Sequence, residues 1–145
     1  MVTEAILDSS VIIALVTPEK YSQWSNYVIQ NYASFHVLDL SFYEVANSTR
    51  YKISDKFDVK DARTALVKAE KIMTLGTIHR FFEVLPEALN KAIELNITVY
   101  DAAFLSLAEK LKMPFLTLDL KLAINLGNTK YDELIECPIT NRSKS

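Results

Sequence analysis

Short apolar segments alternate with amphipathic helical patterns along this 145-residue chain. The clearest apolar runs cover residues 5–7, 35–38 and 115–118, and each leads into a segment with the apolar spacing of a helix. Strands that alternate with helices of this length predict a parallel sheet, because parallel neighbours need a crossover connection. We therefore expect an α/β fold with a central parallel sheet and helices on both faces.

Helix start and stop signals lie between these runs. Ser9 and Ser10 can cap a helix over residues 11–16, and Asp58 is the predicted N-cap of a long helix that ends at a left-handed Gly76. Other helices are predicted over residues 21–32, 87–95, 101–109 and 120–126, with one that opens at residues 41–44, and other strands over residues 81–85 and 135–137.

Length and composition fit a single domain, since 50% of the residues are hydrophobic. We expect this domain to span residues 1–139 and residues 140–145 to form a flexible tail. No apolar run approaches the ~20 residues that cross a bilayer, and the first residues do not resemble a secretion signal. The single cysteine, Cys137, can form neither an internal disulfide nor a thiolate zinc site. These features predict a cytoplasmic protein without a membrane segment.

Charge is distributed unevenly, although the net charge is only −2. Residues 50–80 hold eight Lys and Arg against four Asp and Glu, which leaves the remainder acidic. A basic region beside an acidic one suits an enzyme that gathers phosphates and metal ions, and it suits a solvated helix equally well. With two glycines in the chain, both phosphate-binding loop motifs are absent.

Four acids stand at the ends of predicted strands or the starts of predicted helices: Asp8, Glu44, Asp101 and Asp119. Asp8 and Asp119 directly follow apolar strands, so we expect them to meet at the carboxyl edge of the sheet. Mg²⁺ and Mn²⁺ prefer such oxygen ligands, and an ion held there can activate water for attack on a phosphodiester. The four acids are therefore the candidate catalytic and metal-binding residues.

Each acid also has a structural interpretation. Asp8 could start a helix, Glu44 could complete a capping box with Ser41, and Asp101 and Asp119 could be charges that favour helix N-termini. Burying several carboxylates is costly without a compensating cation, so the set as a whole favours a cation site.

Other active-site chemistries fit less well. His36 lies in a predicted strand and His79 beside two phenylalanines, so packing or surface roles are favoured over an acid/base pair. An aspartyl-phosphate site would need a second Asp two positions after Asp8, where Ser10 stands. The serine-hydrolase elbow GxSxG is absent.

Four ordered blocks resemble the PIN domain family, and within it the VapC-like toxin ribonucleases. They are LDSSV at residues 7–11, EVAN at 44–47, YDAAFLSLA at 100–108 and LTLDLKL at 116–122. The resemblance covers residues 3–127. It implies a Rossmann-like sheet with the four acids around one or two Mg²⁺ or Mn²⁺ ions, and hydrolysis of RNA by a metal-dependent endoribonuclease.

The same resemblance implies further roles and partners. Ser10 and Thr117 would support the acids by hydrogen bonds, and Asn47 would line the cleft. VapC-like proteins are typically homodimers that a small VapB-like antitoxin inhibits by inserting its C-terminal segment into the active site. Residues 52–85 match the family pattern least, so no substrate-binding residue is assigned there.

Two other functions stay open: a PIN-domain RNA-processing nuclease without an antitoxin, and a weakly catalytic module that binds RNA or protein. The presence of all four acids favours an enzyme, because a binding module has no need of mutually repelling carboxylates. Most aromatics of the first half are expected in the core, and the remainder could form a dimer face or a groove for a partner helix near Glu44. These aromatics are Trp24, Tyr27, Tyr32, Phe42, Tyr43, Tyr51 and Phe57.

Overall fold

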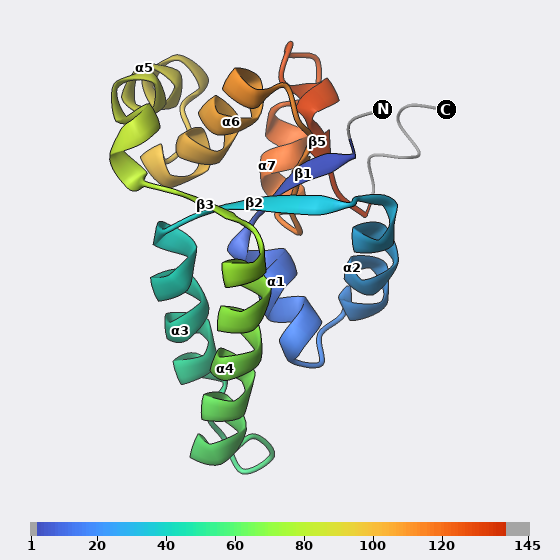
Figure 1. Cartoon of the computed structure of the whole chain (residues 1–145). Helices are drawn as coiled ribbons and strands as arrows, with labels where there is room; N and C mark the ends of the chain where they lie inside the picture. The colour runs from blue at the N-terminus through green and yellow to red at the C-terminus, as the bar shows by residue number, and fades with distance from the viewer. Residues whose placement is uncertain (1–2, 139–145) are drawn as a thin grey trace.

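A parallel five-stranded sheet forms the centre of the protein in the computed structural model, which describes residues 3–138 (Figure 1). The strand order is β3-β2-β1-β4-β5, and every neighbouring pair is parallel. The strands are β1 (Glu4–Leu7), β2 (Ser34–Leu38), β3 (Thr77–His79), β4 (Phe115–Leu116) and β5 (Ile135–Glu136). The predicted α/β fold with a parallel sheet is confirmed. The predicted domain end at residue 139 and the tail over 140–145 lie outside the described residues.

Helices cover both faces of the sheet (Figure 1). One layer contains α1 (Ser9–Val16), α2 (Ser22–Val28), α3 (Leu40–Lys52) and α4 (Val59–Leu75), and the other contains α5 (Leu85–Leu95), α6 (Val99–Leu111) and α7 (Leu120–Asn125). The short 3-10 helices are η1 (Ile29–Asn31), η2 (Phe81–Val84) and η3 (Asp132–Leu134). Within residues 3–138, no helix is both long and apolar enough to cross a bilayer.

The side-chain alternation of β1 divides the core into two. Ala5 and Leu7 point into the layer of α1 to α4, whereas Ile6 packs with α6 and α7 on the other face. All three side chains are fully buried. Because successive strand residues face opposite ways, an unbroken apolar run is what a strand covered on both faces requires.

The strand order places a topological switch point between β1 and β4. From β1 the chain moves to β2 and β3 on one side, then returns to add β4 and β5 on the other. The connecting helices separate at this point, because right-handed crossovers in opposite directions lie on opposite faces. Ligands of such sheets bind in the crevice beyond the carboxyl ends of the strands there.

The strand predicted over residues 81–85 is wrong. Residues 81–84 form the turn η2, and α5 begins at Leu85 with Pro86 in its first turn. The strand is instead Thr77–His79, which pairs with β2 directly after α4. Phe81 and Phe82 stay exposed, so the apolar run reflects a surface cluster and not a buried strand.

The left-handed conformation predicted for Gly76 is also wrong, since its φ of −91° and ψ of −175° are extended. The glycine serves a close approach of two chain segments. A Cβ atom at this position would lie 2.7 Å from the carbonyl oxygen of Phe35 in β2. Its small size lets the chain turn from α4 directly into β3.

The aromatics of the first half of the chain divide between interior and surface. Trp24, Tyr32 and Phe42 are partly buried against the core, whereas exposed fractions reach 66% for Tyr27, 82% for Tyr43 and 79% for Tyr51. The prediction that most of them lie in the core is therefore wrong.

Candidate active site

The chain segments that follow β1 and β4 are joined by hydrogen bonds at the switch point. The hydroxyls of Ser10 and Thr117 both donate to Oδ2 of Asp8, over 2.7 Å and 2.8 Å. The same hydroxyls accept hydrogen bonds from backbone amides, Ser10 from Leu118 and Thr117 from Asp119, each at 3.0 Å. Asp8 is thus fixed in one orientation beside Asp119, as the topology predicts.

The side chain of Asp8 is partly buried. Burial raises its pKa, the hydroxyls of Ser10 and Thr117 oppose that rise, and the charge of Asp119 adds to it. Asp8 precedes the first residue of α1, but its side chain makes no capping hydrogen bond. The helix-start interpretation therefore explains its position in the chain and not its side-chain contacts.

Glu44 projects from α3 toward the same place. Helix α3 already begins at Leu40 and its N-cap is Asp39, so the capping box predicted with Ser41 as an alternative is wrong. Oε1 of Glu44 is buried without a hydrogen-bond partner among the described residues. Burial, followed by the charge of Asp8, raises the pKa of Glu44 to about 7. A cation would compensate this buried carboxylate.

Asp101 belongs to the first turn of α6, on the other face of the sheet. The helix starts at Val99, earlier than the predicted start at residue 101. Its N-cap is Thr98, whose hydroxyl accepts a hydrogen bond from the backbone amide of Asp101 at 3.1 Å. Burial raises the pKa of Asp101, and the charges of Asp119 and Asp8 raise it further. Its position in a first turn agrees with the helix-charge interpretation, but its neighbours are acids.

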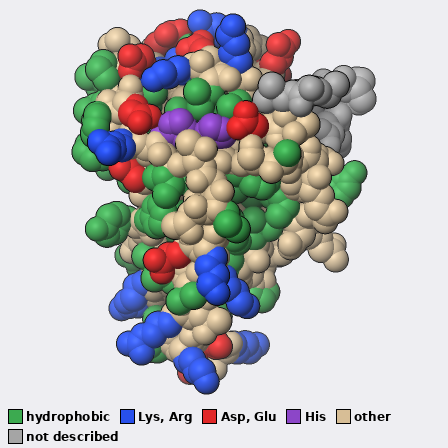
Figure 2. Space-filling view, in the orientation of Figure 1, with side chains coloured by type: hydrophobic (Ala, Val, Ile, Leu, Met, Phe, Trp, Pro, Cys, Tyr) green, Lys and Arg blue, Asp and Glu red, His purple; other side chains and the backbone are tan. Residues whose placement is uncertain are grey.

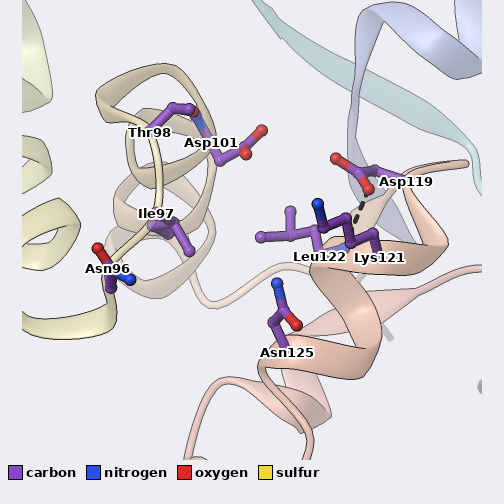
Figure 3. A pocket seen from close by; sticks show the side chains of 8 residues that line it. All are labelled: Asn96, Ile97, Thr98, Asp101, Asp119, Lys121, Leu122 and Asn125. Carbon is purple, nitrogen blue, oxygen red and sulfur yellow. Dashed lines mark hydrogen bonds between the residues drawn. The ribbon is translucent and has the colours of Figure 1, made fainter.

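Asp119 combines two roles. It is the N-cap of α7, where its Oδ1 accepts from the backbone amide of Leu122 at 3.0 Å, so the helix-start interpretation of this residue is confirmed. It also borders a pocket of about 360 Å³ that Asp101 lines from the opposite side (Figure 3). One carboxylate therefore both starts a helix and faces the cavity.

The four predicted acids form one cluster, because the charges of some of them affect the pKa values of others. Asp8 is affected by Asp119, Glu44 by Asp8 and Asp101, and Asp101 by Asp119 and Asp8. Asp8 and Asp119 follow the carboxyl ends of β1 and β4, whereas Glu44 and Asp101 come from the two helical layers. Asp8 and Asp119 are 111 positions apart in sequence. Nearby carboxylates thus add to the raised pKa values of Asp8, Glu44 and Asp101, and such shifts recur at cation and catalytic sites.

An all-carboxylate donor set suits Mg²⁺ or Mn²⁺, which prefer oxygen ligands. The buried, unpartnered Oε1 of Glu44 is an observation that fits such an ion. In the part of the chain that the structure describes, however, no three His, Cys, Asp or Glu side chains are already arranged to hold one ion. A Mg²⁺ site that uses few carboxylates, several waters and substrate phosphate oxygens needs no such preformed cage.

The remaining predicted residues have different environments. Ser10 and Thr117 make the hydrogen bonds to Asp8 that the family resemblance implies. Asn47 is exposed on α3, three residues after Glu44, and hydrogen-bonds none of the acids within residues 3–138. A role for Asn47 stays a prediction.

Asp39 shows that a position directly after a strand does not by itself place an acid in the cluster, because the order of the strands in the sheet also matters. It follows β2 as Asp8 follows β1, and its Oδ1 is buried without a partner among the described residues. Yet none of the charge effects on Asp8, Glu44 or Asp101 comes from Asp39. Strand β2 lies one position away from the switch point, so this acid stands apart from the cluster.

The two histidines are neighbours outside the acid cluster. Nδ1 of His36 lies 2.8 Å from Nε2 of His79, and their rings stack at 5.1 Å. Glu4 binds the outer nitrogen of His36 and Glu83 that of His79, each at 3.0 Å. Figure 2 shows the pair between acidic side chains on the molecular surface. Sequence reasoning did not predict this contact, because it depends on the pairing of β2 with β3.

The basic surplus of residues 50–80 is concentrated on the arm that α3 and α4 form (Figure 2). A surface hollow of about 400 Å³ along α4 is lined largely by its cations. They are Lys60, Arg63, Lys68 and Lys71. The cations that are close in sequence therefore also share one surface of α4.

The chain belongs to the PIN domain family, whose pattern it matches over residues 5–124. A curated relative, Ribonuclease VapC3 of Pyrobaculum aerophilum, is 34% identical over 119 residues, which cover 81% of this chain and 91% of the relative. The family predicted from the four sequence blocks is confirmed.

Solved structures share the fold at lower identity. PAE2754 from Pyrobaculum aerophilum has a TM-score of 0.65 at 23% identity over 86% of each chain. A chain of a toxin-antitoxin complex from Klebsiella pneumoniae has a TM-score of 0.68 at 11% identity over 92% of this chain and 97% of its own. VapBC2 from Rickettsia felis, bound to a promoter DNA fragment, has a TM-score of 0.59 at 13% identity, with 92% and 98% covered.

Proposed function

We propose that this protein is an endoribonuclease that hydrolyses RNA phosphodiesters with Mg²⁺ or Mn²⁺ and serves as the toxin of a toxin-antitoxin pair. The observation that carries the proposal is the convergence of Asp8, Glu44 and Asp101, with raised pKa values, on Asp119 at the switch point. The 34% identity to a protein named a ribonuclease supports RNA as the substrate.

The four acids would hold the cation, which supplies an activated water and stabilises the departing oxygen when it is bound. The protein's own part is to place the carboxylates in advance. Ser10 and Thr117 fix the orientation of Asp8 at Oδ2. Glu44 and Asp101 approach from opposite faces of the sheet, so carboxylates from both helical layers would help to hold the cation. No histidine or serine nucleophile is required in this arrangement.

Incubation of the purified protein with a mixed RNA pool and Mn²⁺ tests the proposal. We expect cleavage by the wild type, loss of cleavage with EDTA, and loss in Asp8→Asn and Asp101→Asn. Asp39→Asn is the matched control, because it removes a strand-end carboxylate outside the cluster and should leave cleavage unchanged. Equal cleavage by the wild type and both cluster variants would overturn the carboxylate mechanism.

A small antitoxin is the proposed protein partner. Two solved chains with this fold come from toxin-antitoxin or VapBC complexes, and the curated relative carries the VapC name, which supports a VapB-like inhibitor. Co-expression of a short reading frame adjacent to this gene should relieve growth arrest caused by the wild type. Growth arrest that persists with every adjacent frame would count against a paired antitoxin.

A homodimer is proposed as the assembly. The face of α5 exposes Leu85, Leu89 and Ile93 at four-residue spacing, and Phe81 and Phe82 extend this apolar surface. These residues are better placed for a dimer face than the aromatics near Glu44, since a helix stripe next to an apolar turn is contiguous. Light scattering coupled to size exclusion should give twice the chain mass at micromolar concentration, and a monomer would contradict this assembly.

A further inference from the structure

The pocket beside Asp101 and Asp119 contains groups that a cation site does not need. Its wall opposite α6 comes from α7, which contributes Lys121, Leu122 and Asn125 (Figure 3). The loop between α5 and α6 closes it with Asn96 and Ile97. The pocket thus joins two acids of the cluster to one cation, two amides and two apolar side chains.

Size and composition restrict what this pocket can hold. Its volume of about 360 Å³ is near the lower end of the range of ~300–1,000 Å³ common for small-ligand sites, so it suits one nucleotide and not a duplex. The apolar part of the lining is mainly Ile97, which is partly buried and can contact a planar base, because Leu122 is only 4% exposed. Single-stranded RNA is recognised in this way, with bases turned out and contacted individually.

The polar groups of α7 are available for a ligand. Lys121 and Asn125 are exposed and make no ion pair or side-chain hydrogen bond with any other described residue. In Figure 3 the Lys121 amine and the Asn125 amide are directed into the space between α6 and α7. A lysine amine binds phosphate as a point charge, and an amide both donates to and accepts from a base edge.

Asn96 has a simpler explanation and does not carry the argument. It adopts a left-handed conformation at the end of α5, with φ 54° and ψ 49°, where Asn and Gly are the favoured residues. Lys121 and Asn125 have no such backbone requirement, because both lie in the right-handed helix α7.

We infer that this pocket binds the nucleotide next to the scissile phosphate, with Lys121 on the phosphate backbone and Asn125 on the base edge. The inference deepens the proposed ribonuclease function and rests on it. Asp101 and Asp119 border the pocket, so a nucleotide seated there has its phosphate at the acid cluster. Because the Asn125 amide presents a donor and an acceptor side by side, it favours bases whose edge offers the matching acceptor and donor.

Cleavage of a random-sequence RNA pool, read by sequencing of the product ends, tests the inference. The wild type should prefer certain bases at one position beside the cut, and Asn125→Ala should reduce that preference by about tenfold at this position alone. Lys121→Ala should raise KM by about tenfold with little change in kcat, and Lys121→Arg should restore it. The controls are Asn90→Ala and Lys110→Ala, exposed helix residues outside the pocket.

A second readout separates this inference from the ribonuclease proposal. The four nucleoside monophosphates are titrated, with Mg²⁺, into isotopically labelled protein while the side-chain amide signals of Asn125 are followed by NMR. At least one nucleotide should shift these signals, and Lys121→Ala should raise the dissociation constant read from the shift by about tenfold.

Two possible results overturn the pocket assignment, and a third separates it from the nuclease proposal. Cleavage with an unchanged base preference in Asn125→Ala, or no amide shift with any nucleotide, would overturn the pocket assignment. A wild type that cleaves no RNA but still shows the nucleotide-dependent shift would refute the nuclease proposal and retain the pocket.

Discussion

The Thr117 hydroxyl donates a hydrogen bond to Oδ2 of Asp8 over 2.8 Å, across 109 positions of sequence. The hydroxyl oxygen of Thr117 also accepts a hydrogen bond from the backbone amide of Asp119 at 3.0 Å, so one buried side chain positions an acid on each side of the switch point. Thr117 thereby links the two strand ends whose proximity the topology predicts.

Replacing Thr117 by the near-isosteric valine should lower RNA cleavage by about 10–100-fold, because hydrogen bonds to charged groups contribute about 1.5–3 kcal/mol. Thr117→Ser keeps the hydroxyl and should retain most activity. Single-turnover cleavage rates, measured with thermal unfolding of each variant, distinguish lost positioning from lost folding. Equal losses in the valine and serine variants would show that the hydroxyl is not what positions Asp8.

The pH dependence of stability should reflect Glu44. Its pKa is raised from 4.5 to about 7 in the folded state, so between these values the folded protein binds a proton that the unfolded chain releases. The free energy of unfolding must therefore fall as pH rises from about 5 to 7. The raised pKa values of Asp8 and Asp101 act in the same direction.

Urea unfolding in EDTA, at pH 5 to 8, checks this prediction. Glu44→Gln cannot ionise, so its stability should decline less steeply over this range than that of the wild type. Parallel pH profiles for the two proteins would contradict the burial of the Glu44 carboxylate.

Gly76→Ala should destabilise the fold by about 1–3 kcal/mol, the usual effect of overpacking. The added Cβ would lie 2.7 Å from the Phe35 carbonyl oxygen, and backbone on both sides leaves little room to adjust. Gly127→Ala is the control, because its nearest contact is 3.2 Å, and its stability should stay within about 1 kcal/mol of wild type. Chemical denaturation measures both, and an unaffected Gly76→Ala would refute the close approach of α4 and β2.

His36 and His79 should be energetically coupled. Nδ1 of His36 and Nε2 of His79 lie 2.8 Å apart, and Glu4 and Glu83 lie 3.0 Å from the outer nitrogens of the two rings. A double-mutant cycle with His36→Ala and His79→Ala should give an interaction free energy of about 0.5–3 kcal/mol. Strictly additive effects would mean that the contact contributes nothing to stability.

The parallel sheet and the positions of Asp8 and Asp119 were predictable because short buried strands between helices leave a clear apolar pattern. The strand Thr77–His79 was not, since its stability comes from pairing with β2 and only three residues carry the signal. The run that begins at Phe81 is more apolar, so the strand was predicted there, although its aromatic side chains lie on the surface.

The candidate site was predictable to a different degree at each acid. Glu44 and Asp101 depended on the family resemblance, because helix-start roles explain such residues equally well from sequence. Lys121 and Asn125 were not predicted as site residues. Their spacing of four places them on one face of the short helix that begins beside Asp119, and this spacing could have indicated a shared pocket. Asp39 also follows a strand directly, but its strand β2 does not border the switch point between β1 and β4.

Binding of Mn²⁺ to the acid cluster is the most direct test of the account. Electron paramagnetic resonance of free Mn²⁺, titrated with wild type, Asp8→Asn, Glu44→Gln, Asp101→Asn and Asp119→Asn, gives each dissociation constant without RNA. We predict that every cluster variant binds Mn²⁺ at least about tenfold more weakly than the wild type, whereas Asp39→Asn binds normally. Unchanged binding in the four variants, or an equal loss in Asp39→Asn, would contradict a shared cation site at the switch point.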